Sequence, residues 1–356
     1  MKKLYIDSDI TDIANRLEPF YDKLAGKRIL LSGGGGFLGR YFTAVFQHLN
    51  RDVLTEPCEL TVLDNFVSAN NPHYEDGERE GVTFIHHNVI ESFDTNNIRY
   101  DYIIQAAGIA SPFYYKAYPL ETIEVSVTGT KNLLELARNT GARLMFFSSS
   151  EIYGDPDPKH IPTPESYLGN VSCLGARACY DESKRLGETL CRVYHTHLGV
   201  HTNMVRPFNV FGPGMGELDY RVLPNLASKA KDGQPFNIYG DGRQTRTFCY
   251  ITDAIVGFMH ILLRGVPGEP YNIGNPKPEI SMLELAEISK DLMNLTNEIN
   301  LIEYPDSYPA DEPNRRCPDI SKARIQLGYE PKVALRDGLQ RFYEWTNENF
   351  VGEKGL

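Results

Sequence analysis

A tyrosine and a lysine four residues apart, Tyr180 and Lys184, are a first pair that could do chemistry. In a helix this spacing places both side chains on one face, one turn apart. A tyrosine phenol normally titrates near pH 10, which is too high for a base at neutral pH, but a nearby ammonium group favours the phenolate. The pair could therefore take a proton from a hydroxyl group. The same spacing is also common in ordinary surface helices, so the pair needs a second signal.

A glycine cluster supplies that second signal. Gly33, Gly36 and Gly39 form Gly-x-x-Gly-x-x-Gly directly after an apolar run at 28–32 and before a helical pattern. Without side chains in the way, backbone N–H groups at a helix start can approach a diphosphate closely. Asp64 ends the next apolar run, where a carboxylate can accept both ribose hydroxyls of NAD and repels the 2′-phosphate of NADP. The alternative is a turn required only by strand-to-helix geometry, with Asp64 as an ordinary cap.

The elements that must position these residues alternate along the chain. Strands are expected at 28–32, 60–63, 82–85, 102–105, 143–147 and 201–205, and helices at 37–49, 118–139 and 180–198. Alternating strands and helices favour a parallel sheet with right-handed crossovers. We therefore predict an α/β fold: a Rossmann-type doubly wound parallel sheet with a smaller C-terminal α/β substrate-binding lobe.

Three regions follow from these patterns. Residues 1–26 are expected to form an N-terminal helical extension, with apolar residues at helical spacing over 9–24. Residues 27–209 are expected to form the NAD-binding Rossmann domain. Residues 210–356 are richer in Pro-Gly turns and are expected to form mainly the substrate-binding lobe, with 244–264 returning to the main domain.

The composition limits the classes of function. The chain has 356 residues, of which 41% are hydrophobic and 23% are charged, as in soluble globular proteins. Its 36 Lys and Arg against 47 Asp and Glu give a net charge of −11, which disfavours nucleic acid as a partner. The six cysteines show no Cys-x-x-Cys pair or zinc-type spacing, so we expect reduced, mostly buried thiols and no metal. No apolar stretch reaches the length of a membrane span, and we expect a cytoplasmic protein with no membrane partner.

Five segments carry a resemblance to a known family. They are SSSEIYGDP at 148–156, RACYDESKR at 177–185, FNVFGP at 208–213, QTRTF at 244–248 and RRCPDI at 315–320. With the glycine turn, they make the sequence resemble the extended short-chain dehydrogenase/reductase family over about residues 27 to 345. Within that family it looks like the UDP-glucuronate decarboxylases, also called UDP-xylose synthases. The resemblance implies NAD as cofactor, a nucleotide-diphosphate sugar as substrate, and a homodimer formed through the helices at 118–139 and 180–198.

The resemblance also implies a mechanism. In this family the tyrosine removes a sugar hydroxyl proton while a hydride passes to NAD. The ketone formed at ring position four is beta to the carboxylate, so carbon dioxide leaves readily, and NAD is recycled within the reaction. The implied catalytic residues are Tyr180, Lys184, Glu151, Ser150 and Arg316. Tyr180 and Ser150 would donate to the enolate oxygen. Arg316 would contact the substrate carboxylate, with Arg315 as its rival.

Further binding residues follow from the same resemblance. Those expected to contact NAD are Gly33, Gly36, Phe37, Leu38, Gly39, Asp64, Asn65, Asn88, Val89, Ala106, Ala107, Gly108, Tyr180 and Lys184. Those expected to contact the substrate are Ser111, Tyr115, Asn209, Arg221, Tyr239, Arg246 and Arg316.

Other functions fit part of this pattern. A nucleotide-sugar 4-epimerase or 4,6-dehydratase would use the same first oxidation, although Ser150 in place of an Asp argues against dehydration. A catalytically silent NAD-binding protein would keep the fold, but the presence of Tyr180, Lys184 and Glu151 argues against that function.

Overall fold

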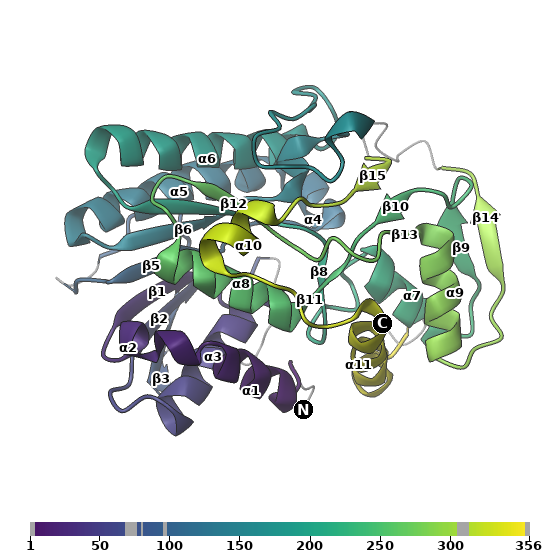
Figure 1. The fold of residues 1–356 in the computed structure, drawn as a ribbon, viewed down its shortest axis with the longest axis horizontal. Coiled ribbons are helices and arrows are strands. Elements are labelled where there is room, and N and C mark those ends of the chain that lie inside the picture. Colours follow the sequence, from purple (N-terminus) through teal and green to yellow (C-terminus); the bar gives the residue numbers. More distant parts are fainter. Residues whose placement is uncertain (1–3, 68–76, 80, 95–97, 305–312, 353–356) are drawn as a thin grey trace.

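A parallel sheet organises the computed structural model, which describes residues 4–67, 77–79, 81–94, 98–304 and 313–352. Its eight strands follow the order β12-β7-β6-β5-β1-β2-β4-β3. They are β1 (Arg28–Ser32), β2 (Glu59–Asp64), β3 (Gly77–Arg79), β4 (Val82–His86), β5 (Tyr102–Gln105), β6 (Arg143–Phe147), β7 (Thr202–Pro207) and β12 (Pro270–Ile273). Only β3 pairs antiparallel among these described strands, with β4. The predicted doubly wound parallel sheet is confirmed (Figure 1).

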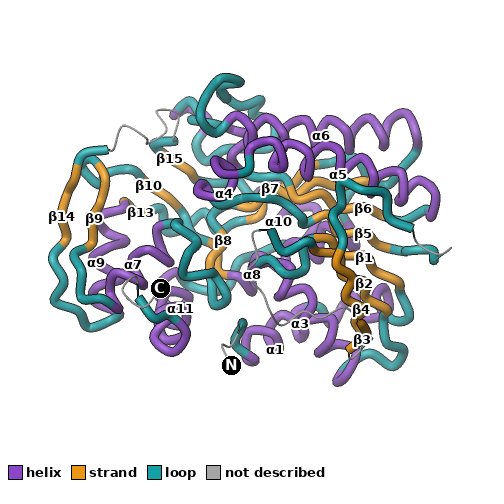
Figure 2. The backbone as a smooth tube through the Cα atoms, turned by 180° about the vertical axis from the view of Figure 1, so that it is seen from behind, coloured by secondary structure: helices purple, strands orange, loops and turns teal. Residues whose placement is uncertain are grey.

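Long helices cover both faces of this sheet. They are α3 (Phe37–Asp52), α5 (Pro119–Thr140), α6 (Ala178–Leu198) and α8 (Ile251–Arg264). Helices α5 and α6 lie on one face, and α3 and α8 lie on the other (Figures 1 and 2). Leu30 of β1 packs in the apolar core below α5 and α6, whereas Ile29 and Leu31 pack in the core that includes α3 and α8. Because both faces are buried, β1 is an almost continuous apolar run, as is usual in parallel sheets.

The N-terminal extension is a broken helix rather than the single helix expected over 9–24. Its elements are α1 (Asp7–Arg16), the 3-10 turn η1 (Glu18–Phe20) and α2 (Tyr21–Leu24). The break falls at Pro19, because proline has no N–H to continue an α-helical ladder. Helix α1 packs on α3 and α8, and Arg16 forms a 2.7 Å ion pair with the fully buried Asp253. The extension therefore covers one core of the main domain.

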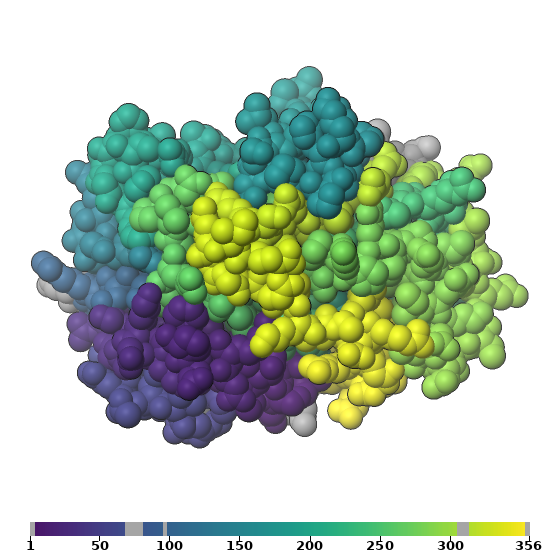
Figure 3. All heavy atoms as spheres, viewed as in Figure 1, coloured from purple at the N-terminus to yellow at the C-terminus, as the bar shows by residue number. Residues whose placement is uncertain are grey.

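The C-terminal part forms a smaller lobe and also returns to the main sheet. The lobe elements are β8 (Val210–Phe211), α7 (Val222–Lys231), β9 (Phe236–Tyr239), β10 (Thr245–Arg246), β11 (Cys249–Tyr250), β13 (Ile280–Ser281), α9 (Met282–Leu292), β14 (Ile299–Ile302), β15 (Arg315–Arg316) and α11 (Leu335–Asn349). Within the range 244–264, α8 lies on the main sheet, whereas β10 and β11 belong to the lobe. Two later elements also join the main sheet, because β12 pairs with β7 and α10 (Ser321–Leu327) packs on β12. In Figure 3 the yellow C-terminal residues lie against both the purple N-terminal segment and the green lobe.

Three short elements follow the carboxyl ends of the strands, where ligands bind in folds of this kind. They are α4 (Pro112–Ala117) after β5, and η2 (Ser150–Tyr153) and η3 (Pro158–His160) after β6. Glu151 of η2 contacts Arg316 of β15, so this edge of the sheet faces the lobe. All six cysteines are free, and four of them are buried, as the sequence predicts.

Candidate active site

The glycine turn between β1 and α3 is shaped for close approach of a ligand. Gly33 has a φ of +78°, which favours glycine, and a Cβ at this position would lie 2.6 Å from the backbone nitrogen of Ala107. A Cβ at Gly39 would collide with the Gly33 carbonyl oxygen, so this glycine lets α3 pack against the turn. Gly36, the N-cap of α3, has only that oxygen at 3.4 Å from its Cβ position. The turn therefore fits the diphosphate of a dinucleotide.

A cleft with about 760 Å³ of empty space opens beside this turn. The predicted cofactor residues that line it are Gly33, Gly36, Asp64, Asn65, Asn88, Val89, Ala106, Ala107 and Gly108. Phe37, Leu38 and Gly39 form the first turn of α3 and are not part of this lining. Lining residues that the sequence analysis missed are Leu63, Val67, His87, Ile90, Ile109, Glu121 and Val125. Most are direct neighbours of predicted residues, whereas Glu121 and Val125 come from α5, which carries no local motif.

Asp64 lies at the carboxyl end of β2 and faces the glycine turn. Its Oδ2 accepts a hydrogen bond from the Gly35 N–H at 2.7 Å, and its Oδ1 accepts one from the Phe66 N–H at 2.7 Å. Burial raises the pKa of the Asp64 carboxyl, and these backbone hydrogen bonds oppose that rise. The two contacts hold the carboxylate at the cleft wall, where ribose hydroxyls of NAD would donate to it.

Asp64→Asn should weaken NAD binding about tenfold or more, because a hydrogen bond to a charged group contributes roughly 1.5–3 kcal/mol. It should also reduce the preference for NAD over NADP, since the repulsive charge is removed. Titration calorimetry of cofactor-free protein with both dinucleotides measures the two effects. Glu59→Gln removes a carboxylate from the exposed start of β2 and should leave both affinities unchanged. If Asp64→Asn binds NAD as tightly as the wild-type protein does, Asp64 does not bind the ribose of NAD.

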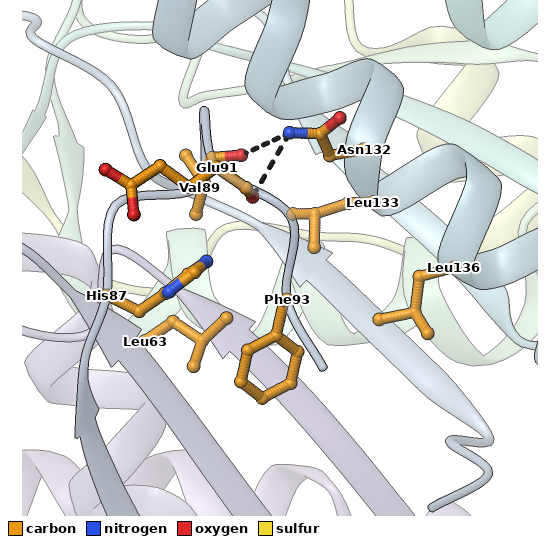
Figure 4. Close-up of a pocket in the computed structure, with 8 residues that line it drawn as sticks. All are labelled: Leu63, His87, Val89, Glu91, Phe93, Asn132, Leu133 and Leu136. Carbon is orange, nitrogen blue, oxygen red and sulfur yellow. Dashed lines mark hydrogen bonds between the residues drawn. The ribbon is translucent and has the colours of Figure 1, made fainter. Parts of the chain in front are cut away.

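A small second cavity lies behind the wall of this cleft (Figure 4). It shares Leu63, His87 and Val89 with the cleft. Asn132 of α5 donates hydrogen bonds to the carbonyl oxygens of Val89 and Ile90 at 3.0 Å and of Glu91 at 3.2 Å. This amide therefore fixes the segment after β4 that forms one wall of the cleft.

Tyr180 and Lys184 are both buried in the first turns of α6, as the spacing predicts. The Lys184 Nζ donates to the Phe147 carbonyl oxygen at 2.8 Å and lies 5.8 Å from the centroid of the Tyr180 ring. The absence of a side chain at Gly108 leaves space for this ammonium group, because a Cβ there would lie 3.0 Å from Nζ. The Lys184 ammonium therefore lies next to both the Tyr180 ring and Gly108, which lines the cleft.

The pKa of Tyr180 is raised, whereas the sequence analysis expected the nearby ammonium group to lower it. Burial raises the pKa of Tyr180, and this effect outweighs a hydrogen bond with the Ser149 side chain and the charges of Arg221 and Arg177, which lower it. Burial also lowers the pKa of Lys184 to about 8. In the ligand-free protein the phenol is therefore the stable form at neutral pH.

Turnover should fall as the pH rises above about 8, because burial lowers the pKa of Lys184 and its positive charge is lost there. The charge favours the phenolate, so its loss makes Tyr180 a less available base. In Lys184→Arg the guanidinium keeps its charge throughout the pH range of the assay, and the alkaline limb of kcat/KM should move upward by about one unit or more. An unchanged limb in this variant would show that another group titrates.

The serine that contacts Tyr180 is Ser149, whereas the sequence analysis selected Ser150. The Ser149 side chain hydrogen-bonds Tyr180. Its Oγ also accepts a hydrogen bond from the Glu151 N–H at 3.2 Å. Ser150 is buried at the start of η2, and its role as a donor to the enolate oxygen stays a prediction. Three adjacent serines gave no sequence signal that separates these positions.

Glu151 and Arg316 are in direct contact, which the sequence analysis did not predict. The Arg316 Nη2 donates to the Glu151 Oε2 at 2.8 Å, and its Nη1 lies 3.4 Å from the Asn209 Oδ1. The rival Arg315 is turned away and forms two hydrogen bonds with Glu279, at 2.8 and 2.7 Å. The structure therefore brings Arg316, and not Arg315, to the edge of the sheet.

Three further residues that the sequence analysis assigned to the substrate are Tyr115, Arg221 and Ser111. Tyr115 stacks on Tyr180 with ring centroids 5.5 Å apart, and Arg221, which pairs with Asp219, acts on the Tyr180 pKa through its charge. Ser111 is the N-cap of α4, one turn before Tyr115.

Two more of the predicted substrate residues, Tyr239 and Arg246, have partners within the lobe. Tyr239 ends β9 and stacks on Tyr304 with centroids 5.7 Å apart. Arg246 donates to the carbonyl oxygens of Thr245, Pro313 and Asn314 at 2.7–3.2 Å, so it anchors the approach to β15. A phosphate contact by Arg246 stays a prediction.

A buried polar network holds the Arg316 segment against the sheet. Arg206 of β7 donates to both oxygens of Glu188, at 2.8 and 2.6 Å, and to the Tyr153 hydroxyl at 2.7 Å. Tyr153 in turn donates to Asn272 at 2.8 Å, and the Asn272 amide donates to the Asp319 carbonyl oxygen at 3.0 Å. Asp319 lies three residues after Arg316, so the network links η2, β7 and β12 with the segment that follows β15.

Two negative findings apply to the described residues alone. They contain no cluster of His, Cys, Asp or Glu that could hold a metal ion. None of their helices combines the length and the apolar character that a membrane crossing requires.

Comparisons with known proteins show the family of this chain. Residues 29–274 match the model of the NAD dependent epimerase/dehydratase family. The chain is 41% identical to UDP-glucuronic acid decarboxylase 5 of Arabidopsis thaliana over 321 residues, which cover 88% of this chain and 87% of the relative. It is 39% identical to UDP-glucuronic acid decarboxylase 1 of Xenopus tropicalis over 316 residues, 88% of this chain and 71% of that one.

Solved structures show the same architecture. DesIV, a dTDP-glucose 4,6-dehydratase from Streptomyces venezuelae with NAD bound, has a TM-score of 0.77 at 26% identity, covering 92% of this chain and all of its own. The epimerase Mth375 from Methanothermobacter thermautotrophicus has a TM-score of 0.78 at 26% identity, covering 96% and 97%.

Proposed function

The chain belongs to the NAD-dependent epimerase/dehydratase family and, within it, to the UDP-glucuronic acid decarboxylases, and from this premise we propose that it converts UDP-glucuronate to UDP-xylose and carbon dioxide. The observation that carries the proposal is the 2.8 Å contact between Glu151 and Arg316, which are 165 residues apart in sequence. It brings a guanidinium suited to a carboxylate to the edge of the sheet that also carries the tyrosine–lysine pair.

Different side chains have separate roles in the proposed reaction. When bound, NAD supplies a hydride acceptor at the sugar and later returns the hydride. The positive charges of Lys184 and of the bound nicotinamide would favour the phenolate of Tyr180, which then takes the proton of the ring hydroxyl while Ser149 hydrogen-bonds it. Arg316 holds the glucuronate carboxylate, and UDP-glucose would leave this guanidinium without an anionic partner in the substrate.

The decarboxylation itself needs little from the protein. In the 4-keto intermediate the carboxylate is beta to the carbonyl, so the bond to carbon dioxide breaks and its electron pair moves into the carbonyl as an enolate. Hydrogen-bond donors at the enolate oxygen stabilise this charge, and we assign that role to Tyr180 with Ser149 or Ser150. A proton then returns to the ring carbon, and reduction of the ketone gives the pentose.

Incubation of the protein with UDP-glucuronate and NAD tests the proposal. We expect carbon dioxide in equal amount to a UDP-pentose, with no net change in NAD. UDP-glucose is the matched control and should give no carbon dioxide. A product that retains all carbons would instead support an epimerase or a dehydratase, which the solved structures of the family include.

We also propose a homodimer in the cytoplasm. Helices α5 and α6 pack side by side, and their outer faces expose large apolar side chains. These are Leu120 and Ile123 on α5, and Leu186 and Val193 on α6. A second copy of this chain would cover them. The six free cysteines suit a reducing compartment. Sedimentation velocity should show twice the monomer mass.

A further inference from the structure

The charged network around Glu151 contains an arginine to which the proposed reaction assigns no role. Arg177 is the N-cap of α6, and its side chain is 6% exposed. Its Nη2 hydrogen-bonds the Glu151 Oε2, the same oxygen that accepts the 2.8 Å bond from Arg316. One carboxylate oxygen therefore contacts two guanidinium groups that come from two different elements, α6 and β15.

Arg177 has a second anchor that is independent of the lobe. Its Nε lies 3.5 Å from the Oδ2 of Asp181, one turn further along α6, and both side chains are 6% exposed. Arg177 and Asp181 belong to the same helix as Tyr180, so their arrangement does not depend on the position of β15. Arg316, by contrast, reaches Glu151 from β15.

A bound substrate changes the charge balance of this network. Without substrate, Asp181 and Glu151 contribute two negative charges, and Arg177 and Arg316 contribute two positive charges. A glucuronate carboxylate on Arg316 makes three carboxylates for two guanidinium groups. Since Arg316 has to turn from Glu151 toward the substrate, Glu151 then depends on Arg177. A buried carboxylate without any cation is strongly disfavoured.

We propose that Arg177 is the permanent counterion of Glu151, a positioning residue that holds this carboxylate in place while Arg316 transfers to the carboxylate of the substrate. The inference rests on the proposed function, because UDP-glucuronate supplies the third carboxylate. Glu151 contacts Arg177 at the start of α6 and Arg316 on β15. The other charged groups on the elements beside η2 have different partners: Asp181 pairs with Arg177, Lys184 and Arg185 donate to backbone carbonyl oxygens, and Arg206 pairs with Glu188.

The first test is the equilibrium preference for a carboxylate. NADH-loaded protein, which does not oxidise the sugar, is titrated with UDP-glucuronate and with UDP-glucose. Arg177→Gln/Asp181→Asn removes the pair together and leaves no orphaned aspartate, so it protects folding. In this variant Glu151 keeps Arg316, and the preference for UDP-glucuronate should fall about tenfold or more. Adding Glu151→Gln releases Arg316 and should restore the preference to within about threefold.

The second test is the pH profile of turnover. In Arg177→Gln/Asp181→Asn, the acid limb of kcat/KM should move upward by about one pH unit or more, because Glu151 protonates more readily. Arg177→Lys keeps the charge and should return the limb to within about half a unit. Arg185→Gln is the matched control: Arg185 holds η2 only through the carbonyl oxygen of Ile152, and its loss should leave the limb in place.

The outcomes separate the two proposals. A wild-type protein that neither releases carbon dioxide nor prefers UDP-glucuronate contradicts the proposed function. A wild-type protein that does both, with the same preference and acid limb in Arg177→Gln/Asp181→Asn, contradicts the role of Arg177. Equal defects in Arg177→Lys and Arg177→Gln/Asp181→Asn without a shifted limb would show that the arginine only supports the fold.

Discussion

Tyr180→Phe should reduce carbon dioxide release from UDP-glucuronate about 10³-fold or more, because a positioned acid–base group contributes roughly 10² to 10⁴ in rate. The substitution removes only the hydroxyl. The ring keeps its stacking on Tyr115, where the centroids are 5.5 Å apart, so packing around it should not change. We therefore expect NAD affinity within about twofold of wild type, as measured by calorimetry alongside the product assay.

Tyr194→Phe is the matched control for this experiment. Tyr194 lies on the same helix, but its hydroxyl bonds Glu135 of α5, away from Ser149 and Lys184. This variant should turn over substrate at a near-normal rate. Near-normal turnover in Tyr180→Phe would overturn the assignment of the base. Loss of NAD binding in Tyr180→Phe would show that the hydroxyl serves the cofactor site instead.

Arg206→Met should lower the free energy of unfolding by about 3–5 kcal/mol, the usual cost of removing one partner of a buried ion pair. Glu188 would keep a carboxylate whose side chain is only 12% exposed, without its bidentate cation. The Tyr153 hydroxyl would lose a donor as well. Urea denaturation followed by circular dichroism measures the loss. We also expect a higher KM for UDP-glucuronate, because the network holds the segment after Arg316.

The double variant Arg206→Met/Glu188→Gln checks the physical cause. It removes both charges, so no orphaned carboxylate remains, and it should recover roughly half of the lost stability. A single variant that loses less than about 1 kcal/mol would show that Glu188 reaches water more easily than its burial indicates.

The parts of the site that depend on local backbone could be predicted from the sequence. Gly33 and Gly39 are required by a positive φ and a close helix approach, and Tyr180 and Lys184 face one way because of helical periodicity. Parallel strands are also visible locally, because burial on both faces demands apolar runs.

The parts that depend on long-range packing could not. Ser149 is the one of three adjacent serines that hydrogen-bonds Tyr180. This depends on the backbone path after β6, which the sequence does not show. Arg177 stands in a recognised segment, but its partner Glu151 is 26 residues away. Strand β12 has only four residues, too few to show a pattern, so nothing in its sequence assigns it to the main sheet.

The chain passes between the sheet and the lobe repeatedly: β7 is followed by lobe strands, α8 and β12 return to the sheet, β15 belongs to the lobe again, and α10 packs on β12 before α11. Neither unit is therefore encoded by one continuous stretch of sequence. Limited proteolysis would not release a self-standing lobe, and heating should melt both units in a single calorimetric transition. The many connections also favour slow folding, since distant segments must pair before either core closes.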